Sequence, residues 1–131
     1  MRGIFLAIFI CSFLIPGLHA QFSKDSLLNA VKDSLLNNVA TSKNDTDRVY
    51  SLRLLSEYYV NSHPDSALLF AQQGLELADK MKFGNGKGNC LYSMGKIFLH
   101  SGNYTKALES YLKALDVFTL LDDKTWLPLF L

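Results

Sequence analysis

Residues 91–114 read LYSMGKIFLHSGNYTKALESYLKA. On both sides of the central Ser101-Gly102-Asn103, apolar side chains recur every three or four residues, which is the spacing of one helix face. Glycine and asparagine favour turns, so they are expected to end the first helix. The stretch therefore predicts two helices joined by a three-residue turn, and so short a turn requires the two helices to pack antiparallel.

The same pattern occurs forty residues earlier in the chain. Leu54, Tyr58, Ala67 and Gly74 correspond, in this order, to Met94, Phe98, Ala107 and Ala114. A fixed period in this range is typical of stacked helical repeats, in which each unit buries its apolar face against a neighbouring unit. Proteins of this type bind partners and rarely catalyse reactions, so the period favours a binding function.

Apolar periodicity along the rest of the chain predicts an all-α fold of about five helices. The expected helices span about residues 23–40, 47–61, 64–81, 89–100 and 104–121. We expect Asp45 or Thr46 to cap the second helix, and Pro64 to occupy the first position of the third, where its missing N–H costs nothing. Phe83–Gly88 is rich in glycine and is expected to be a flexible loop.

The first twenty residues have the composition of a secretory signal peptide. Arg2 precedes the uninterrupted apolar run Ile4–Leu14, and Ala20 provides a small residue at a plausible cleavage point. The run is too short to span a bilayer comfortably. We therefore expect an exported protein, periplasmic or extracellular, in which the signal is cleaved rather than kept as an anchor and no stable membrane span remains.

The whole chain is expected to have four segments. They are a signal peptide at residues 1–20, an N-terminal amphipathic helix with a linker at 21–45, two helical hairpins of the repeat at 46–123, and an apolar tail at 124–131 that is expected to be a truncated third repeat.

Charge and composition argue against several classes of function. The 131 residues include 13 basic and 12 acidic side chains, a balance that does not point to a nucleic-acid partner. Cys90 is the single cysteine outside the expected signal segment, so a disulfide within the mature chain is not expected. His63 and His100 lack the ligand spacing of a metal site. The sequence implies no cofactor and no metal.

The second helical pair has large, small and aromatic residues at the positions of a known repeat. These residues are Leu91, Met94, Gly95, Phe98, Gly102, Tyr104, Ala107, Tyr111 and Ala114. The pattern resembles the tetratricopeptide repeat (TPR). The first pair matches less closely, since Leu55 replaces the glycine and Ala71 the aromatic residue. The resemblance covers about residues 46–123, so the two hairpins of this segment are expected to be TPR-like, and it implies a solenoid of antiparallel helix hairpins.

The arrangement is also similar to the secreted N-terminal region of bacterial sensor proteins, in which TPRs precede a membrane helix and a histidine kinase or DNA-binding output domain. The segments that carry this likeness are Asp25–Leu28, Asn44–Val49 and Asp65–Leu68. The sequence ends at Leu131 without such an output domain. A truncated sensory input domain of a histidine kinase or transcriptional regulator is therefore an alternative function.

By the TPR resemblance, the first helix of each pair lines a concave face that binds a peptide or protein partner. The expected partner-binding residues are Arg53, Ser56, Tyr59, Tyr92, Lys96, Leu99 and His100, with Leu52, Val60 and Ser93 on the same face. Arg53 and Lys96 are suited to pair with carboxylates. The tyrosines are suited to stack on a peptide. An exported protein-interaction or scaffold module is the main hypothesis.

A small hydrolase is a second alternative. Its candidate nucleophile and base, Cys90 and His100, lie ten residues apart on one expected helix, which separates them by about 15 Å. Hydrogen-bond reach is about 3 Å. The glycines of Gly84–Gly88 follow an expected helix rather than the strand that precedes a phosphate-binding loop. We therefore do not expect an enzyme.

The tail, residues 124–131, reads KTWLPLFL and is strongly apolar. Pro128 is incompatible with the interior of a regular helix. A helical solenoid normally ends in a capping element with a polar outer face. The sequence therefore predicts an apolar C-terminal edge through which the protein self-associates.

Overall fold

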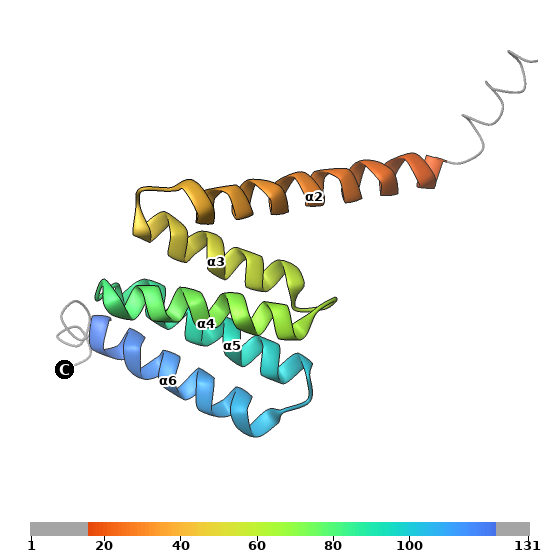
Figure 1. Ribbon diagram of the computed structural model, residues 1–131. Helices are drawn as coiled ribbons and strands as arrows, with labels where there is room; N and C mark the ends of the chain where they lie inside the picture. Colours follow the sequence, from red (N-terminus) through yellow and green to blue (C-terminus); the bar gives the residue numbers. More distant parts are fainter. Residues whose placement is uncertain (1–15, 123–131) are drawn as a thin grey trace, which may run out of the picture. The chain divides into compact units, whose positions relative to one another are not determined.

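The structure, a computed structural model, describes residues 16–122, and these residues are helical apart from short turns. The helices are α2 (Pro16–Thr41), α3 (Asp45–Tyr59), α4 (Pro64–Lys80), α5 (Gly84–His100) and α6 (Tyr104–Asp122). From α3 to α6, successive helices run in alternating directions (Figure 1). Helices α3 and α4 form one antiparallel hairpin and α5 and α6 the next, so the predicted all-α fold of helix hairpins is confirmed within the described residues.

Helix α2 contains the boundary between two compact units of the chain, which falls after Asp33. The sequence predicted a helix start near Ser23, but α2 begins at Pro16. Proline is tolerated at the first position of a helix, because the N–H that it lacks would have no helical partner there. The predicted signal segment up to residue 15 and the tail from residue 123 lie outside the described residues.

In the second unit, the end of α2 is joined to α3 by two hydrogen bonds. The Asn38 side-chain amide donates to Ser51 Oγ at 2.8 Å, and Arg48 Nε donates to the carbonyl oxygen of Val39 at 3.2 Å. Both bonds cross between the helices, and both are partly buried. They fix the end of α2 against the first hairpin.

Local sequence determines where α3 and α4 begin, and one of the two predicted helix starts needs correction. Asn44 caps α3, because its side-chain oxygen accepts a hydrogen bond from the Thr46 N–H at 3.0 Å. The expectation that Asp45 or Thr46 would be the cap was wrong, since both residues already lie in the first turn of the helix. Pro64 occupies the first position of α4, as predicted.

Helices α4 and α5 end in the same geometry. The second residue after each helix has a positive φ, 54° at Lys82 and 75° at Gly102. The N–H of the following residue then donates back into the last turn, at 2.8 Å in both cases. This is the usual left-handed helix ending, in which glycine is favoured because it has no Cβ. Lys82 adopts it without that advantage.

The predicted glycine-rich loop is wrong, because α5 begins at Gly84 and includes these glycines. Large side chains pack directly onto this first part of α5. A Cβ at Gly88 would lie 2.7 Å from the ring of Phe118, and one at Gly86 would lie 2.9 Å from Val49. The glycines therefore allow close packing within a helix rather than flexibility between helices.

The core lies between the two hairpins. One buried cluster contains Val49, Ala78 and Cys90, and a second contains Ala67, Ala71 and Ile97. The three alanines of α4, Ala67, Ala71 and Ala78, are thus fully buried. Within the second hairpin, a Cβ at Gly95 would lie 2.6 Å from the ring of Tyr111, so α5 and α6 approach closely at this glycine. Within residues 16–122, none of the helices combines the length and the apolar character needed to cross a membrane.

Candidate functional site

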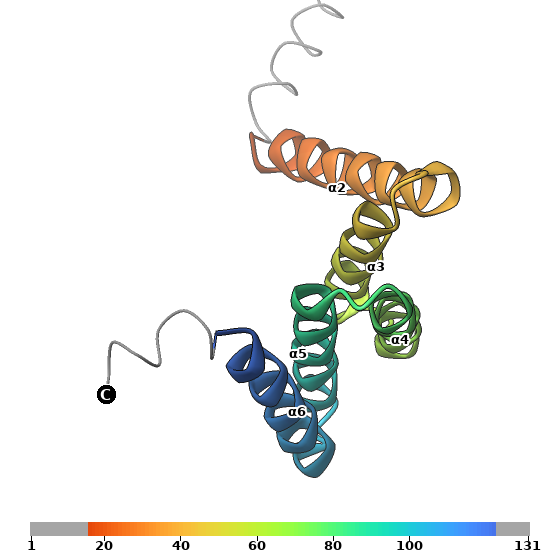
Figure 2. The same ribbon diagram turned by 90° about the vertical axis from the view of Figure 1, so that its left-hand side faces the viewer.

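The predicted partner-binding residues lie on α3 and α5, the first helices of the two hairpins. These helices run in the same direction (Figure 1) and contact each other. Figure 2 shows them as neighbours, each with its own hairpin partner beside it. We call the surface to which they contribute the α3–α5 surface, with the members Arg53, Glu57, Tyr92, Lys96, Leu99 and His100.

The Glu57 carboxylate pairs with both predicted cations of this surface, Arg53 and Lys96. Glu57 Oε1 lies 2.8 Å from Arg53 Nη1 on the same helix and 3.5 Å from Lys96 Nζ on α5. The first distance is that of a charge-assisted hydrogen bond. The second belongs to a looser ion pair between side chains that are 41% and 33% exposed, and such a pair contributes little to stability. Lys96 is therefore the more available of the two cations.

Three residues predicted for this face are not on the surface, because Ser93 is buried as well as Ser56 and Leu52. Ser56 is fully buried, and its hydroxyl donates a hydrogen bond to the Arg53 carbonyl oxygen at 2.7 Å. Leu52 is also buried. Both belong to the core side of α3, so Ser56 is not available to a ligand. The Nε of Arg53 and the hydroxyl of Ser93 are buried without a hydrogen-bond partner among the described atoms.

One aromatic ring, that of Tyr92, lies beside Lys96 on α5. Its ammonium lies 5.8 Å from the centroid of the Tyr92 ring, within the range of a cation–π interaction. Tyr92 in turn lies 5.4 Å from Tyr111 of α6. These two tyrosines line an apolar groove of about 520 Å³, together with Leu115 and Phe118. Tyr92 is half exposed, so its ring is accessible for stacking.

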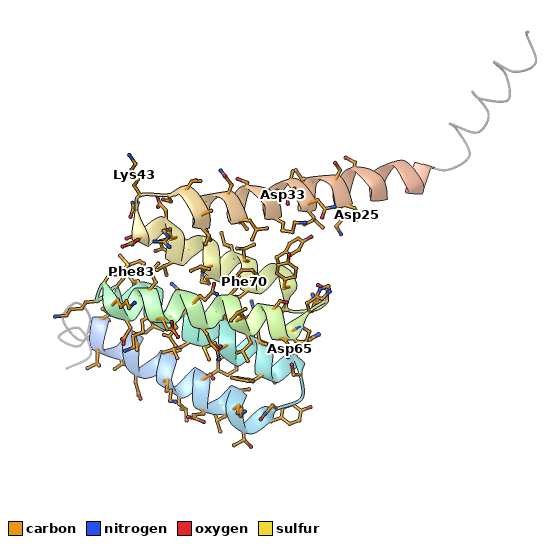
Figure 3. The ribbon with its side chains drawn as sticks, viewed as in Figure 1. Asp25, Asp33, Lys43, Asp65, Phe70 and Phe83 are labelled. Carbon is orange, nitrogen blue, oxygen red and sulfur yellow. The ribbon has the colours of Figure 1, made fainter. Side chains whose placement is uncertain are left out.

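Tyr59 is placed differently from Tyr92. Phe70 reaches from α4 toward α3 (Figure 3), and its ring stacks on Tyr59 with centroids 5.7 Å apart and planes 17° apart. Tyr58 and His63 also contact the Tyr59 ring edge to face. One face of Tyr59 is thus occupied by its own chain, which leaves it less free than Tyr92 to stack on a partner.

A shallow groove of about 660 Å³ runs beside the ends of α3 and α5. It is lined by Val60, Asn61, Lys96, Leu99 and His100. The structure thus brings together four residues predicted for this face, Val60 from the end of α3 and Lys96, Leu99 and His100 from α5. Leu99 is half exposed, which gives the groove an apolar contact next to a cation.

The candidates for hydrolytic chemistry are separated. Cys90 is fully buried in the core, and burial raises the pKa of its thiol to about 11. His100 is exposed at the other end of α5. A buried thiol with a raised pKa is protonated near neutral pH and is a poor nucleophile. Among the described residues, no group of histidine, cysteine and carboxylate side chains is placed to hold a metal ion.

A family described as the SusR N-terminal TPR domain matches residues 21–125, which is most of the chain. The chain belongs to this family. The resemblance to TPR proteins is therefore confirmed, and TPR domains are typically non-catalytic modules that bind other proteins. No curated protein and no solved structure matches the chain.

The sequence did not predict two residues of this site, Glu57 of the α3–α5 surface and Asn61 of the groove beside it. Glu57 was not proposed, although it follows Arg53 by four residues, a spacing at which opposite charges meet on a helix. Its second contact, with Lys96, depends on how α3 and α5 pack and leaves no local signal. Asn61 lies just after α3, in a turn that the sequence assigned to the end of that helix.

Proposed function

We propose that this chain is an exported protein-interaction module, and that a peptide or protein segment binds on its α3–α5 surface. The observation that carries the proposal is the position of Lys96. Its ammonium faces the Tyr92 ring and Glu57, and its side chain lines the groove that contains Leu99 and His100. A partly exposed cation beside accessible aromatic and apolar side chains is suited to a peptide that carries a carboxylate and an apolar group.

A partner carboxylate would compete with Glu57 for Lys96. The 3.5 Å separation of Lys96 and Glu57 leaves room for a closer ion pair, and both side chains are partly exposed. Arg53 is held more tightly by Glu57, so it would keep Glu57 in place while Lys96 turns to the partner. We expect the bound peptide to place its carboxylate at Lys96 and an apolar side chain against Leu99.

The proposal can be tested with a phage-displayed library of random peptides and the full chain as bait. Peptides that it selects should bind Lys96→Glu and Leu99→Asp variants at least ten-fold more weakly than the wild type. The control is Lys43→Glu, which makes the same change of charge at an exposed lysine before α3. Circular dichroism checks that each variant is folded. Equal affinity of all four proteins for the selected peptides would refute the proposed surface.

Export is supported by the signal-like pattern of residues 1–20 and by a family match that begins at residue 21. If the signal is cleaved after Ala20, the mature protein begins at Gln21. Mass spectrometry of the protein expressed with its full N-terminus measures this directly. A product that retains residues 1–20 would contradict cleavage.

A second candidate is the sensory input domain of a histidine kinase or transcriptional regulator. The description of the matched family as an N-terminal domain favours this candidate. In this case the α3–α5 surface would bind a signal-bearing partner, and another domain would transmit the response. Sequencing the gene beyond the codon for Leu131 discriminates the two. A continuing frame with a membrane helix supports the input domain, and a stop codon supports a free-standing module.

A further inference from the structure

A second groove lies outside the α3–α5 surface, where α4, α5 and α6 meet. Figure 2 shows α5 between its neighbours α4 and α6, and both contact it. The groove measures about 500 Å³, and Leu75, Leu91 and Val117 give it an apolar floor. This size is in the range of sites that hold small molecules or a few side chains of a peptide.

The charges at the rim of this groove are unevenly paired. Both of its cations are engaged, since Lys87 Nζ lies 2.6 Å from Asp79 and Lys113 Nζ lies 2.6 Å from Glu109. The two other charged residues of the rim are carboxylates, Glu76 and Asp116. Neither of them has a hydrogen bond or ion pair with any described residue. The unpaired charge of the groove is therefore negative.

The repeat itself places these two carboxylates. Glu76 and Asp116 are forty residues apart, which is the period of the chain, and each lies twelve residues after the first residue of its helix. Glu76 stands on α4 and Asp116 on α6, so each of the two hairpins contributes one carboxylate to the rim. Both residues are exposed to solvent.

We propose that this groove binds a segment of a partner protein in which a basic side chain stands next to a bulky apolar one. The apolar side chain covers the floor formed by Leu75, Leu91 and Val117. The guanidinium or ammonium group pairs with Glu76 and Asp116, because arginine and lysine are the natural partners of exposed carboxylates. This site takes a cation, whereas the α3–α5 surface takes a carboxylate, so the two sites are independent.

The test uses the full chain and a fluorescent peptide of alternating leucine and arginine as the probe. Two matched peptides replace every arginine by glutamate or every leucine by serine. We expect only the leucine–arginine peptide to bind, with an affinity that falls as salt is added. The double variant Glu76→Gln/Asp116→Asn should bind it at least ten-fold more weakly than the wild type.

The matched control is Asp47→Asn/Asp65→Asn, which also removes two exposed carboxylates but leaves the groove unchanged. Asp65 lies at the start of α4 (Figure 3). We expect the control to bind within two-fold of the wild type. The proposal is overturned if the wild type does not bind the leucine–arginine peptide, or if the Glu76/Asp116 variant binds it as well as the control does.

Amide chemical shifts locate the bound peptide. Titration of the ¹⁵N-labelled full chain should shift the amide signals of Leu75, Leu91 and Val117. Shifts that are confined to Lys96 and Leu99 would place the basic peptide on the other surface and overturn this proposal, while leaving the α3–α5 surface in use.

Discussion

Replacing Gly95 by alanine tests the close contact between α5 and α6. The new Cβ would lie 2.6 Å from two carbons of the Tyr111 ring, whereas ordinary van der Waals contact begins at about 3.4 Å. The ring must move away from α5, and overpacking of this kind costs about 1 to 3 kcal/mol. Against this, alanine is favoured over glycine in a helix interior by about 1 kcal/mol. We expect Gly95→Ala to lower the free energy of unfolding by about 1 kcal/mol.

Gly95→Ala should change the free energy of unfolding in the opposite direction when the Tyr111 ring is removed. In a Tyr111→Ala background no side chain opposes the new methyl group, so the helix propensity alone remains and Gly95→Ala should stabilise by about 1 kcal/mol. The difference between the two backgrounds, about 2 kcal/mol, is the coupling of the two positions in a double-mutant cycle.

Urea denaturation followed by circular dichroism at 222 nm measures all four proteins of this cycle. The m-value should be similar in the four proteins, because each exposes nearly the same surface on unfolding. If Gly95→Ala changes the free energy of unfolding by the same amount in both backgrounds, then Tyr111 does not pack against Gly95 and the account of this hairpin is wrong.

Three further predictions address helix ends, the thiol and self-association. Lys82→Gly should stabilise the protein by about 0.5 to 1 kcal/mol and Gly102→Ala should destabilise it by about 1 kcal/mol, because both positions have positive φ. Thermal denaturation measures both variants, and a change of the melting temperature in the same direction in both would contradict the prediction. Because burial raises the pKa of Cys90 to about 11, its thiol is protonated at pH 8 and should react with an aromatic disulfide reagent only when urea unfolds the chain; rapid reaction of the folded protein would refute this. Leu108 and Leu115 are exposed on α6, so we expect the protein to self-associate through this face of α6. The double variant Leu108→Lys/Leu115→Lys should weaken the association in sedimentation equilibrium, and a wild type that stays monomeric at high concentration would contradict the prediction.

Most of the fold could be predicted from the sequence, because its signals are local or periodic. The pairing of α5 with α6 follows from the short turn at Ser101-Gly102-Asn103, and the forty-residue period identifies α3 and α4 as an equivalent pair. The glycines of Gly84–Gly88 were misread, because glycine lowers helix propensity wherever it occurs. Their actual role depends on Phe118, which is thirty residues away in the chain but packs onto Gly88.

The candidate site was less predictable, since it depends on which side of a helix meets another helix. Lys96, Leu99 and His100 were correctly expected to lie near one another, because they share one helix and one face. Ser56 was assigned to the surface from the repeat pattern alone, whereas its burial results from how α3 packs in the core. The sequence alone could not show that Asp116 is unpaired, because this depends on Lys113 forming its ion pair with Glu109.

The central claim, that the α3–α5 surface binds a peptide, is tested most directly by titrating the ¹⁵N-labelled full chain with a peptide selected from the phage library. We expect saturable changes in the amide signals of Tyr92, Lys96 and Leu99, and we expect the Lys96→Glu variant to show no such changes. Saturable binding that shifts signals elsewhere and leaves these three unchanged would contradict it.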